Sequence, residues 1–227
     1  MTKYAGKSQL HALEDRLDAW VYAKEKMVSS LLEGRRVLDV GSGIGTFASL
    51  LAKRGFDVTA VEMDPRCVPS SRNKGVTWVC GNLFGVRDRI PHDFDSVTLL
   101  DVLEHIEDQD KALAAVRNFL AKDGVVVVTV PAFNFLYSRH DRKIGHYRRY
   151  TLGSLRKVMA KNGFKVEKSF YWNAPGVLGW LLTAKILKRD PTTVFNPFLN
   201  KAYGKWFSVE PRCLPFGLTA VVKARKT

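Results

Sequence analysis

The sequence has few cysteines, and none of them lies in a metal-binding pattern. Its three cysteines, Cys67, Cys80 and Cys213, are widely spaced and form no C-x-x-C pair. An odd number of cysteines at such spacings argues against a disulfide framework and against a structural zinc site. We therefore expect reduced thiols.

Long apolar runs are absent as well. No stretch reaches the roughly 18 apolar residues that a membrane span needs, and the N-terminus has no apolar signal segment. A cytoplasmic protein is therefore the default expectation, with peripheral contact at a membrane surface as an open alternative. The 227 residues, of which 46% are hydrophobic, fit one globular domain over residues 1–227.

Negative charge is scarce in the C-terminal part of the chain. Residues 131–227 hold 19 Lys and Arg but 4 Asp and Glu, a net charge of +15, whereas residues 1–130 hold 17 and 18, a net charge of −1. This asymmetry indicates an anionic partner, such as a membrane surface, a nucleic acid or a phosphorylated substrate. A solvated basic face is the alternative interpretation.

Glycine, by contrast, is concentrated at one place, in the sequence Val-Leu-Asp-Val-Gly-Ser-Gly-Ile-Gly that starts at Val37. A short apolar run, three glycines and an apolar helical stretch from Phe47 predict a strand, a tight turn and a helix, the first half of a nucleotide-binding βαβ unit. A dinucleotide site would need a further glycine at position 46, where Thr46 stands. A glycine-rich turn without a ligand is the alternative.

The spacing G-x-G-x-G, preceded by Asp39, resembles motif I of the class I S-adenosylmethionine (SAM) methyltransferases. The resemblance covers about residues 35–172 and the last strand. It implies an α/β fold with a Rossmann-like seven-stranded mixed sheet, mostly parallel, with helices on both faces. The last strand would be antiparallel and would lie between strands five and six.

The cofactor implied by this resemblance is SAM. Glu62 ends a predicted strand over residues 57–62, where a carboxylate can accept hydrogen bonds from both ribose hydroxyls. The resemblance further implies that Asp39 helps to hold the amino group of SAM and that Asn82 meets the adenine amino group. The predicted cofactor-binding residues are Asp39, Gly41, Ser42, Gly43, Gly45, Glu62, Met63, Asn82, Leu83 and Asp101.

The remaining elements follow from hydrophobic periodicity and from stop signals. An amphipathic helix over residues 8–33, ended by Gly34, would cover the edge of the sheet. An aromatic and basic insertion over about 173–212, with Phe195 and Phe198 among its aromatic residues, interrupts the sheet before its last strand. The other predicted elements are strands at 76–79, 94–100, 125–130, 164–172 and 214–224, a helix at 107–120 that Gly124 would stop, and a helix at 151–162 that Thr151 would cap.

The connection over residues 131–150 is long and lacks clear periodicity, which is typical of a functional segment. It leaves the carboxyl end of a central strand, so we expect it to lie over the methyl group of SAM. Its sequence His-Asp, followed by Gly-His-Tyr-Arg-Arg-Tyr-Thr, resembles a bacterial and archaeal branch of the family, many members of which are uncharacterised. The branch therefore implies little about the substrate.

A methyl group on a sulfonium is already activated, so the enzyme must align an acceptor and, for a hydroxyl, remove its proton. Histidine suits this task because its unperturbed pKa is about 6.5. The candidates are His105, His140 and His146, and His140 is favoured because Asp141 stands beside it. Any of the three could instead hydrogen-bond the loop in place.

Two tyrosines and two arginines are the predicted substrate-binding residues. Arg148 and Arg149 are suited to a phosphate or carboxylate of the substrate. Alternatively, one of them pairs with an acidic side chain, Asp141 or Glu104, and only shapes the loop. The full set is Tyr137, Tyr147, Arg148 and Arg149.

The segment Asp101-x-x-Glu104-His105 is similar to a stretch in the O-methyltransferases of ubiquinone biosynthesis. In those enzymes the first carboxylate is usually Glu, and the carboxylates with the histidine have been linked to a divalent metal. Here Asp stands first, so we predict no metal and place His105 in the pocket wall.

Apolar and aromatic residues alternate with lysines over about 174–207, which is typical of a helix in a membrane interface. A lid on the substrate pocket and a dimer contact are the alternatives, and the oligomeric state stays open.

Three functions remain. The first is O-methylation of a small-molecule or lipid- or glycan-linked acceptor. The second is nucleic-acid methylation, which the basic C-terminal part favours. The fourth strand leads into Asp-Val-Leu-Glu and not into the motif of exocyclic-amine methyltransferases, which argues against a base as the target and leaves ribose or phosphate. The third is a non-catalytic SAM-fold subunit, against which the intact glycine loop argues.

Overall fold

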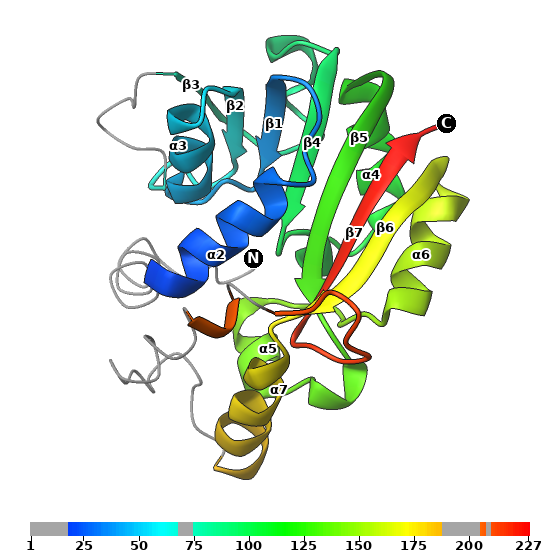
Figure 1. Cartoon of the computed structure of the whole chain (residues 1–227). Helices are drawn as coiled ribbons and strands as arrows, with labels where there is room; N and C mark the ends of the chain where they lie inside the picture. Colours follow the sequence, from blue (N-terminus) through cyan, green and yellow to red (C-terminus); the bar gives the residue numbers. More distant parts are fainter. Residues whose placement is uncertain (1–17, 68–74, 188–204, 208–209) are drawn as a thin grey trace.

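In a computed structural model, the described residues 18–67, 75–187, 205–207 and 210–227 form one seven-stranded sheet with helices on both faces (Figure 1). The strand order is β3-β2-β1-β4-β5-β7-β6. Strands β3, β2, β1, β4 and β5 run parallel, while β7 is antiparallel to both β5 and β6. The predicted fold class, including the placement of the last strand, is confirmed.

The strands lie close to where the apolar runs predict them. Their bounds are Arg36–Val40 (β1), Asp57–Glu62 (β2), Val76–Cys80 (β3), Phe94–Leu100 (β4), Leu120–Pro131 (β5), Phe164–Trp172 (β6) and Thr219–Lys226 (β7). The last strand begins five residues later than the sequence analysis expected. From Gly124 to Val130, β5 is fully buried and consists mainly of valine, as is typical of a strand covered on both faces.

One boundary was predicted wrongly. We expected Gly124 to end the helix before the fifth strand, but helix α4 (Gln109–Phe119) passes directly into β5, and Gly124 lies inside that strand. Asp123, with a φ of 61°, takes the left-handed conformation there, and the pairing of β4 with β5 shifts register beside it. The chain therefore bends at Asp123 and Gly124 through an irregularity within β5, and not at the end of a helix.

Alternating strand residues divide the core between two layers of helices. On one face, α4 and α6 (Leu152–Lys161) pack against the sheet through side chains such as Val116 and Met159. On the other face, α2 (Asp18–Ser29) and α3 (Thr46–Lys53) bury Val28 and Leu51. Thr151 caps α6 as predicted.

Helix α2 packs on the sheet, but its bounds differ from the prediction. The predicted helix spans residues 8–33, but α2 ends at Ser29, and residues 1–17 lie outside the described residues. Gly34, expected as the helix stop, instead turns the chain into β1 with a φ of 64°. A buried carboxylate, that of Glu25, fixes α2 to α3 by accepting two hydrogen bonds from Arg54 at 2.5 and 2.8 Å.

The long connection after β5 is more ordered than its sequence suggests. It contains a short 3₁₀ turn, η3 (Asn134–Leu136), and a helix, α5 (Arg139–Ile144), that begins with a capping box at Ser138. Figure 1 shows α5 next to α7 (Ala174–Trp180) below the carboxyl ends of the strands. A π-helical segment, η4 (Leu181–Ile186), continues α7.

The insertion is described only in part. Phe195 and Phe198, which the sequence analysis assigned to it, lie outside the described residues. Phe207 packs on Trp172 of β6, with ring centroids 4.9 Å apart. Among the residues that the structure describes, no helix is long and apolar enough to cross a membrane.

We predict that Gly45→Ala lowers the melting temperature more than Gly43→Ala does. Both glycines have positive φ, 83° and 57°, which costs alanine about 1 kcal/mol or more. At Gly45 a Cβ would overlap the ring of Trp78, whereas at Gly43 it would meet no atom within 4 Å. The overlap should cost a further 1–3 kcal/mol, roughly. Thermal unfolding of both variants without cofactor measures the difference, and equal losses would contradict it.

Candidate active site

The loop that follows β1 is shaped to let a ligand approach the backbone. Gly41, Gly43 and Gly45 all have positive φ, between 57° and 83°. The amides of Gly41 and Ser42 donate to the carbonyl of Val61 on the neighbouring strand β2, at 2.8 and 3.1 Å. The space beside Gly43 is open, so the loop is fixed on its strand side and accessible on the other.

Glu62, at the end of β2, holds this loop. Its Oε2 accepts a hydrogen bond from the Gly43 amide at 2.8 Å, and its Oε1 accepts one from the Asp64 amide at 2.9 Å. A carboxylate has about four acceptor positions, so each oxygen of Glu62 can accept a further hydrogen bond. The residue can therefore position the loop and still serve the predicted ribose.

Asp39 presents a buried acceptor below the same loop. Its Oδ1 accepts a hydrogen bond from the Thr98 hydroxyl at 2.7 Å, whereas its Oδ2 has no hydrogen-bond partner among the described residues. Burial raises the pKa of this carboxyl to about 7, against the lowering effects of Thr98 and Lys24. An incomplete buried acceptor of this kind fits a cationic group such as the ammonium of SAM.

The residues predicted to meet the adenine lie after β3. Asn82 is exposed, and its Oδ1 accepts a hydrogen bond from the Phe84 amide at 2.7 Å, which leaves the side chain held in a turn. Leu83 is buried in the core beside it. Met63, which follows Glu62, is 54% exposed. An apolar side chain at that position is available to cover a ligand.

The sequence analysis missed Lys24, which α2 places at the carboxyl edge of the sheet. Its Nζ lies 2.5 Å from Oδ2 of Asp101, and its side chain is only 9% exposed. The ammonium also lies over the ring of Trp20, 4.9 Å from the centroid. Lys24 and Asp101 are 77 residues apart, and a lysine within an amphipathic helix gives no sequence signal of such a contact.

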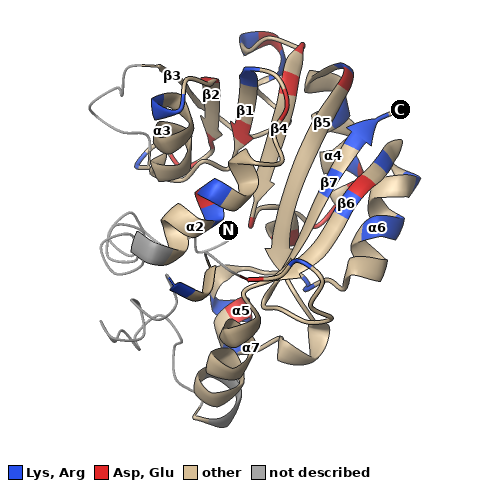
Figure 2. Cartoon of the chain, viewed as in Figure 1, with Lys and Arg blue, Asp and Glu red and all other residues tan. Residues whose placement is uncertain are grey.

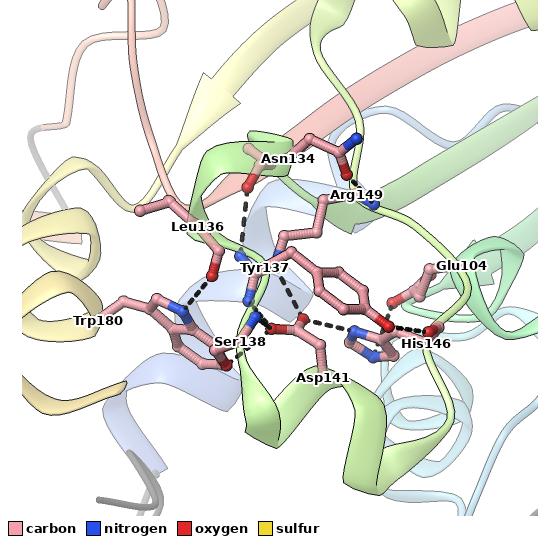
Figure 3. Close-up of polar contacts among 10 residues, drawn as sticks. Glu104, Asn134, Leu136, Tyr137, Ser138, Asp141, His146, Arg149 and Trp180 are labelled. Atoms are coloured by element: carbon pink, nitrogen blue, oxygen red, sulfur yellow. Dashed lines mark hydrogen bonds and ion pairs between the residues drawn. The ribbon is translucent and has the colours of Figure 1, made fainter. Parts of the chain in front are cut away.

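Asp141 is the centre of a buried network in the connection after β5 (Figure 3). Its carboxylate accepts hydrogen bonds from the Ser138 amide and hydroxyl at 2.8 and 2.9 Å. It also accepts two from the guanidinium of Arg149, at 2.8 and 3.1 Å, and one from Nδ1 of His146 at 2.8 Å. Burial alone would raise the pKa of Asp141, but the hydrogen bonds from His146 and Arg149 outweigh it and lower the pKa.

This network changes the expected partner of Asp141. The sequence analysis paired it with its neighbour His140, but the structure directs it to His146, five residues later. Helix α5 explains the difference, because consecutive residues of a helix do not face each other. His140 instead packs edge-on against Trp180 of α7, with ring centroids 5.5 Å apart.

Two of the three predicted histidines come together with Glu104. His105 and His146 are in edge-to-face contact, with ring centroids 4.6 Å apart. Nε2 of His146 lies 3.8 Å from Oε1 of Glu104, a residue with no exposed surface. This cluster lies between the ends of β4 and β5, and Asp101 is on the same segment of chain.

The electrostatics of the cluster favour neutral groups. Burial, and then the charge of Asp101, raise the pKa of Glu104 well above its usual range. Burial and the neighbouring His146 lower the pKa of His105 to about 4. At neutral pH, His105 is therefore an uncharged imidazole, and burial favours the protonated form of Glu104 more than it would at an exposed glutamate.

The same three side chains are close enough to hold a metal ion. One donor atom each from Glu104, His105 and His146 lies within 4.8 Å of the others. A carboxylate with two imidazoles is a donor set used by Zn²⁺ and other borderline divalent metals. We predicted no metal from the sequence, and a bound ion would require Glu104 in its carboxylate form, which burial disfavours.

The predicted substrate residues separate into two groups. Arg149 is buried and paired with Asp141, which is the loop-shaping alternative considered from the sequence. The hydroxyl of Tyr137 donates to the carbonyl of His146 at 2.7 Å, so it also shapes the loop. Tyr147 is exposed, with the guanidinium of Arg148 5.7 Å from its ring. Arg148 is half-buried and donates a hydrogen bond to the carbonyl of Glu107 at 2.7 Å, so only part of its guanidinium can meet a substrate.

Comparison with known proteins identifies a family. A family model that describes a methyltransferase domain matches residues 12–169. A ubiquinone biosynthesis O-methyltransferase of Xanthomonas campestris is 31% identical over 203 residues, which cover 85% of this chain and 78% of that protein. A protein of the same description from Neisseria meningitidis is 31% identical over 103 residues, 42% of this chain and 43% of the relative. For several such relatives, the match spans less than half of their length.

Solved structures have the same fold. A SAM-dependent methyltransferase of Thermotoga maritima, described as a possible histamine N-methyltransferase, has a TM-score of 0.71 at 18% identity, with 97% of this chain and 95% of that chain covered. An N1-methyltransferase of Burkholderia thailandensis, solved with 1,6-didemethyltoxoflavin and S-adenosylhomocysteine, has a TM-score of 0.60 at 21% identity, covering 93% and 79%. At these identities the likeness concerns the fold.

We predict that Asp39 makes the unliganded protein less stable as pH rises. Its pKa is about 7 in the folded protein and 3.8 in an ordinary setting, so between these values the folded state binds more protons than the unfolded state. This contribution to the free energy of unfolding therefore falls as pH rises from about 4 to about 7, by about 1.4 kcal/mol for each pH unit in that range.

Urea unfolding at several pH values measures this effect. Asp39→Asn should gain stability relative to the natural protein as pH rises, because the amide keeps the contact with Thr98 and cannot ionise. Asp88→Asn, at an exposed aspartate, is the control and should follow the natural protein. Parallel pH profiles for Asp39→Asn and the natural protein would contradict the assignment.

Proposed function

The chain belongs to the class I SAM-dependent methyltransferases, and we propose that it transfers the methyl group of SAM to a hydroxyl oxygen of a small molecule. The observation that carries the proposal is the hydrogen bond between Asp141 and His146 beside Glu104, at the end of the sheet where the glycine loop also lies. The names of the relatives, ubiquinone biosynthesis O-methyltransferases, support oxygen as the acceptor atom.

The open side of the glycine loop would receive the methionine part of SAM. The free acceptor of Asp39 suits the ammonium, and the remaining acceptor positions of Glu62 suit the ribose hydroxyls. Asn82 and Leu83 would border the adenine. SAM supplies an activated methyl group on a sulfonium, so the protein has to align the acceptor oxygen and accept its proton.

His146 is the general base of this proposal. Asp141 accepts the proton of Nδ1, which fixes the tautomer in which Nε2 has a free lone pair. That Nε2 points to the Glu104 side, where a hydroxyl can be placed. The buried carboxyl of Glu104 lies beside this position, and neutral His105 completes the wall. Asp141 is a positioning residue in this scheme.

The acceptor that we propose is a hydroxyl on an apolar or lipid-linked compound. Tyr147 and Arg148 lie at the surface next to His146, where an aromatic face and a cation suit an amphipathic molecule with an anionic group.

Methylation of a nucleic-acid ribose or phosphate is the second candidate, and the basic C-terminal half favours it. Several of those cations are engaged inside the fold, however. Lys223 and Arg225 both pair with Glu33 and Glu167.

Transfer of a radiolabelled methyl group distinguishes the two candidate functions. The assay offers hydroxylated aromatic lipids, with structured RNA as the competing substrate. Transfer to neither would favour a non-catalytic subunit.

We predict that the protein binds SAM and not NAD, and that Glu62→Gln weakens SAM binding by about tenfold or more, because an amide cannot accept from both ribose hydroxyls and the loop. Calorimetric titration measures both. Glu107→Gln, at an exposed glutamate, is the control and should bind as the natural protein does. Unchanged affinity of Glu62→Gln would overturn the ribose assignment.

We predict that His146→Gln lowers kcat by about 10²–10⁴-fold with little change in SAM affinity. Asp141→Asn should lower kcat and shift the lower limb of the pH–rate profile, because the amide no longer fixes the tautomer of His146. His140→Gln is the matched control on the same loop and should keep kcat within a few-fold. A larger loss for His140→Gln than for His146→Gln would transfer the role to His140.

Removal of metal ions tests whether His146 acts as a general base or as a metal ligand. If His146 acts as a base, dialysis against a chelator leaves the rate unchanged. If Glu104, His105 and His146 hold a catalytic ion, the rate falls and added Zn²⁺ or Mg²⁺ restores it. Loss of activity on chelation with recovery on metal addition would replace the general-base mechanism while leaving methyl transfer itself in place.

A further inference from the structure

We propose that the exposed leucine face of α7, together with the basic side of α5, docks this protein on the surface of an anionic lipid bilayer. By leucine face we mean Leu178 of α7 and Leu182 of η4, the π-helical segment that continues α7; the two side chains are 72% and 53% exposed. The proposal goes beyond the methyl-transfer function and does not depend on which histidine is the base. It concerns where the enzyme works.

The two leucines lie on one side of a helix whose other side is fixed to the protein. They are four residues apart, so they face the same way. The opposite side of α7 buries Ala174 and Val177. Between these sides, Trp180 donates a hydrogen bond from Nε1 to the carbonyl of Leu136 at 3.0 Å. The leucines therefore point outward from a helix whose opposite side is packed against the rest of the protein.

A third exposed apolar side chain belongs to the neighbouring turn. Phe135 of η3 is 63% exposed and stands one residue before Leu136, whose carbonyl holds Trp180. Single exposed apolar residues are common on protein surfaces, but adjacent ones on anchored elements indicate a contact surface.

The exposed charged side chains of the neighbouring helix α5 all have one sign. Helix α5 contacts α7 through His140 and Trp180, and its exposed charged residues are Arg139, Arg142 and Lys143. The acidic residue of α5, Asp141, is buried and already paired with cations. Apolar residues that enter the headgroup region beside cations that meet lipid phosphates are the pattern of an interfacial helix.

The other two interpretations of this segment fit the structure less well. A lid would turn its apolar side chains toward the pocket, but Leu178 and Leu182 face away from the loop that Trp180 contacts. A symmetric dimer through this face would bring the basic helices α5 of both copies together, and like charges repel. A bilayer of anionic lipids satisfies both the apolar and the basic residues.

Docking would also place the active site at the membrane. The ring of Trp180 lies 4.4 Å from the guanidinium of Arg149, and Arg149 holds the carboxylate of Asp141 (Figure 3). The helix that contacts lipid is thus in direct contact with the loop that carries His146. An apolar acceptor could reach the site from the bilayer without crossing water.

Flotation of the full chain with lipid vesicles tests the proposal, with no SAM or acceptor present. The protein should float with vesicles of phosphatidylcholine and phosphatidylglycerol, bind pure phosphatidylcholine weakly, and lose binding at high salt. Leu178→Glu with Leu182→Glu should reduce the bound fraction by about tenfold. Phe84→Glu, at an exposed aromatic beside α4, is the control and should float as the natural protein does.

A second pair of variants tests the cations. Changing Arg139, Arg142 and Lys143 together to glutamine should abolish the preference for anionic vesicles. The matched control removes the same charge from Arg156, Lys157 and Lys165, exposed residues on α6 and β6, which Figure 2 shows on a different side of the molecule from α5 and α7. This control should bind as before, because those cations do not face the bilayer together with the leucines.

The outcomes are distinct. Equal loss of binding by both charge variants would mean unspecific attraction of a basic protein, which overturns the proposal. So would unchanged flotation of the leucine variant, or a concentration-dependent dimer in sedimentation that the leucine variant dissociates. Circular dichroism confirms that each variant is folded. Flotation without measurable methyl transfer would leave this proposal standing and the catalytic one in doubt.

Discussion

The buried carboxylate of Asp141 is the group on which the arrangement of the active site depends. It accepts hydrogen bonds from the backbone that starts α5, from Arg149 at the end of the loop and from His146 between them. A carboxylate without exposed surface is costly unless its hydrogen bonds are satisfied, so the whole loop has to close around it. One interaction thus determines the path of residues 138–149 and the orientation of a histidine.

The sheet supplies the other half of the site. Because parallel strands end at one edge, the glycine loop after β1, Glu62 after β2 and Glu104 after β4 are brought together from distant parts of the sequence. Helix α2 then closes this edge with Lys24, and α7 closes the far side with Trp180. The result is a frame in which Glu104, whose pKa is raised by burial, and the uncharged His105 line the side that faces His146.

The elements that surround this frame are aromatic, apolar and basic: the turn η3, helix α5 and helix α7. Their composition suits the proposed acceptor at a lipid surface. The contact of Trp180 with Arg149 places the exposed Leu178 and Leu182 on elements next to the loop that carries Asp141 and His146. The proposed membrane contact and the proposed catalytic residues therefore lie in adjoining parts of the molecule.

The sequence by itself determined the strands and the position of the cofactor loop, and its resemblance to class I methyltransferases implied the order of the strands. The apolar runs are of strand length, and the spacing of Gly41, Gly43 and Gly45 before the acidic end of β2 is a local property. The bounds near Gly124 and Gly34 were predicted wrongly because glycine permits several conformations. Near Gly124, the pairing of β4 with β5 decides among them.

Only the tertiary structure decided which side chains meet. Adjacency in the sequence suggested His140 as the partner of Asp141, but helix geometry turns the two apart and the loop returns His146 to the carboxylate. Lys24 and Asp101, or Glu104 and His146, are neighbours only because strands and helices distant along the chain pack together. Contacts between side chains depend on this packing, and no local pattern in a single sequence encodes them.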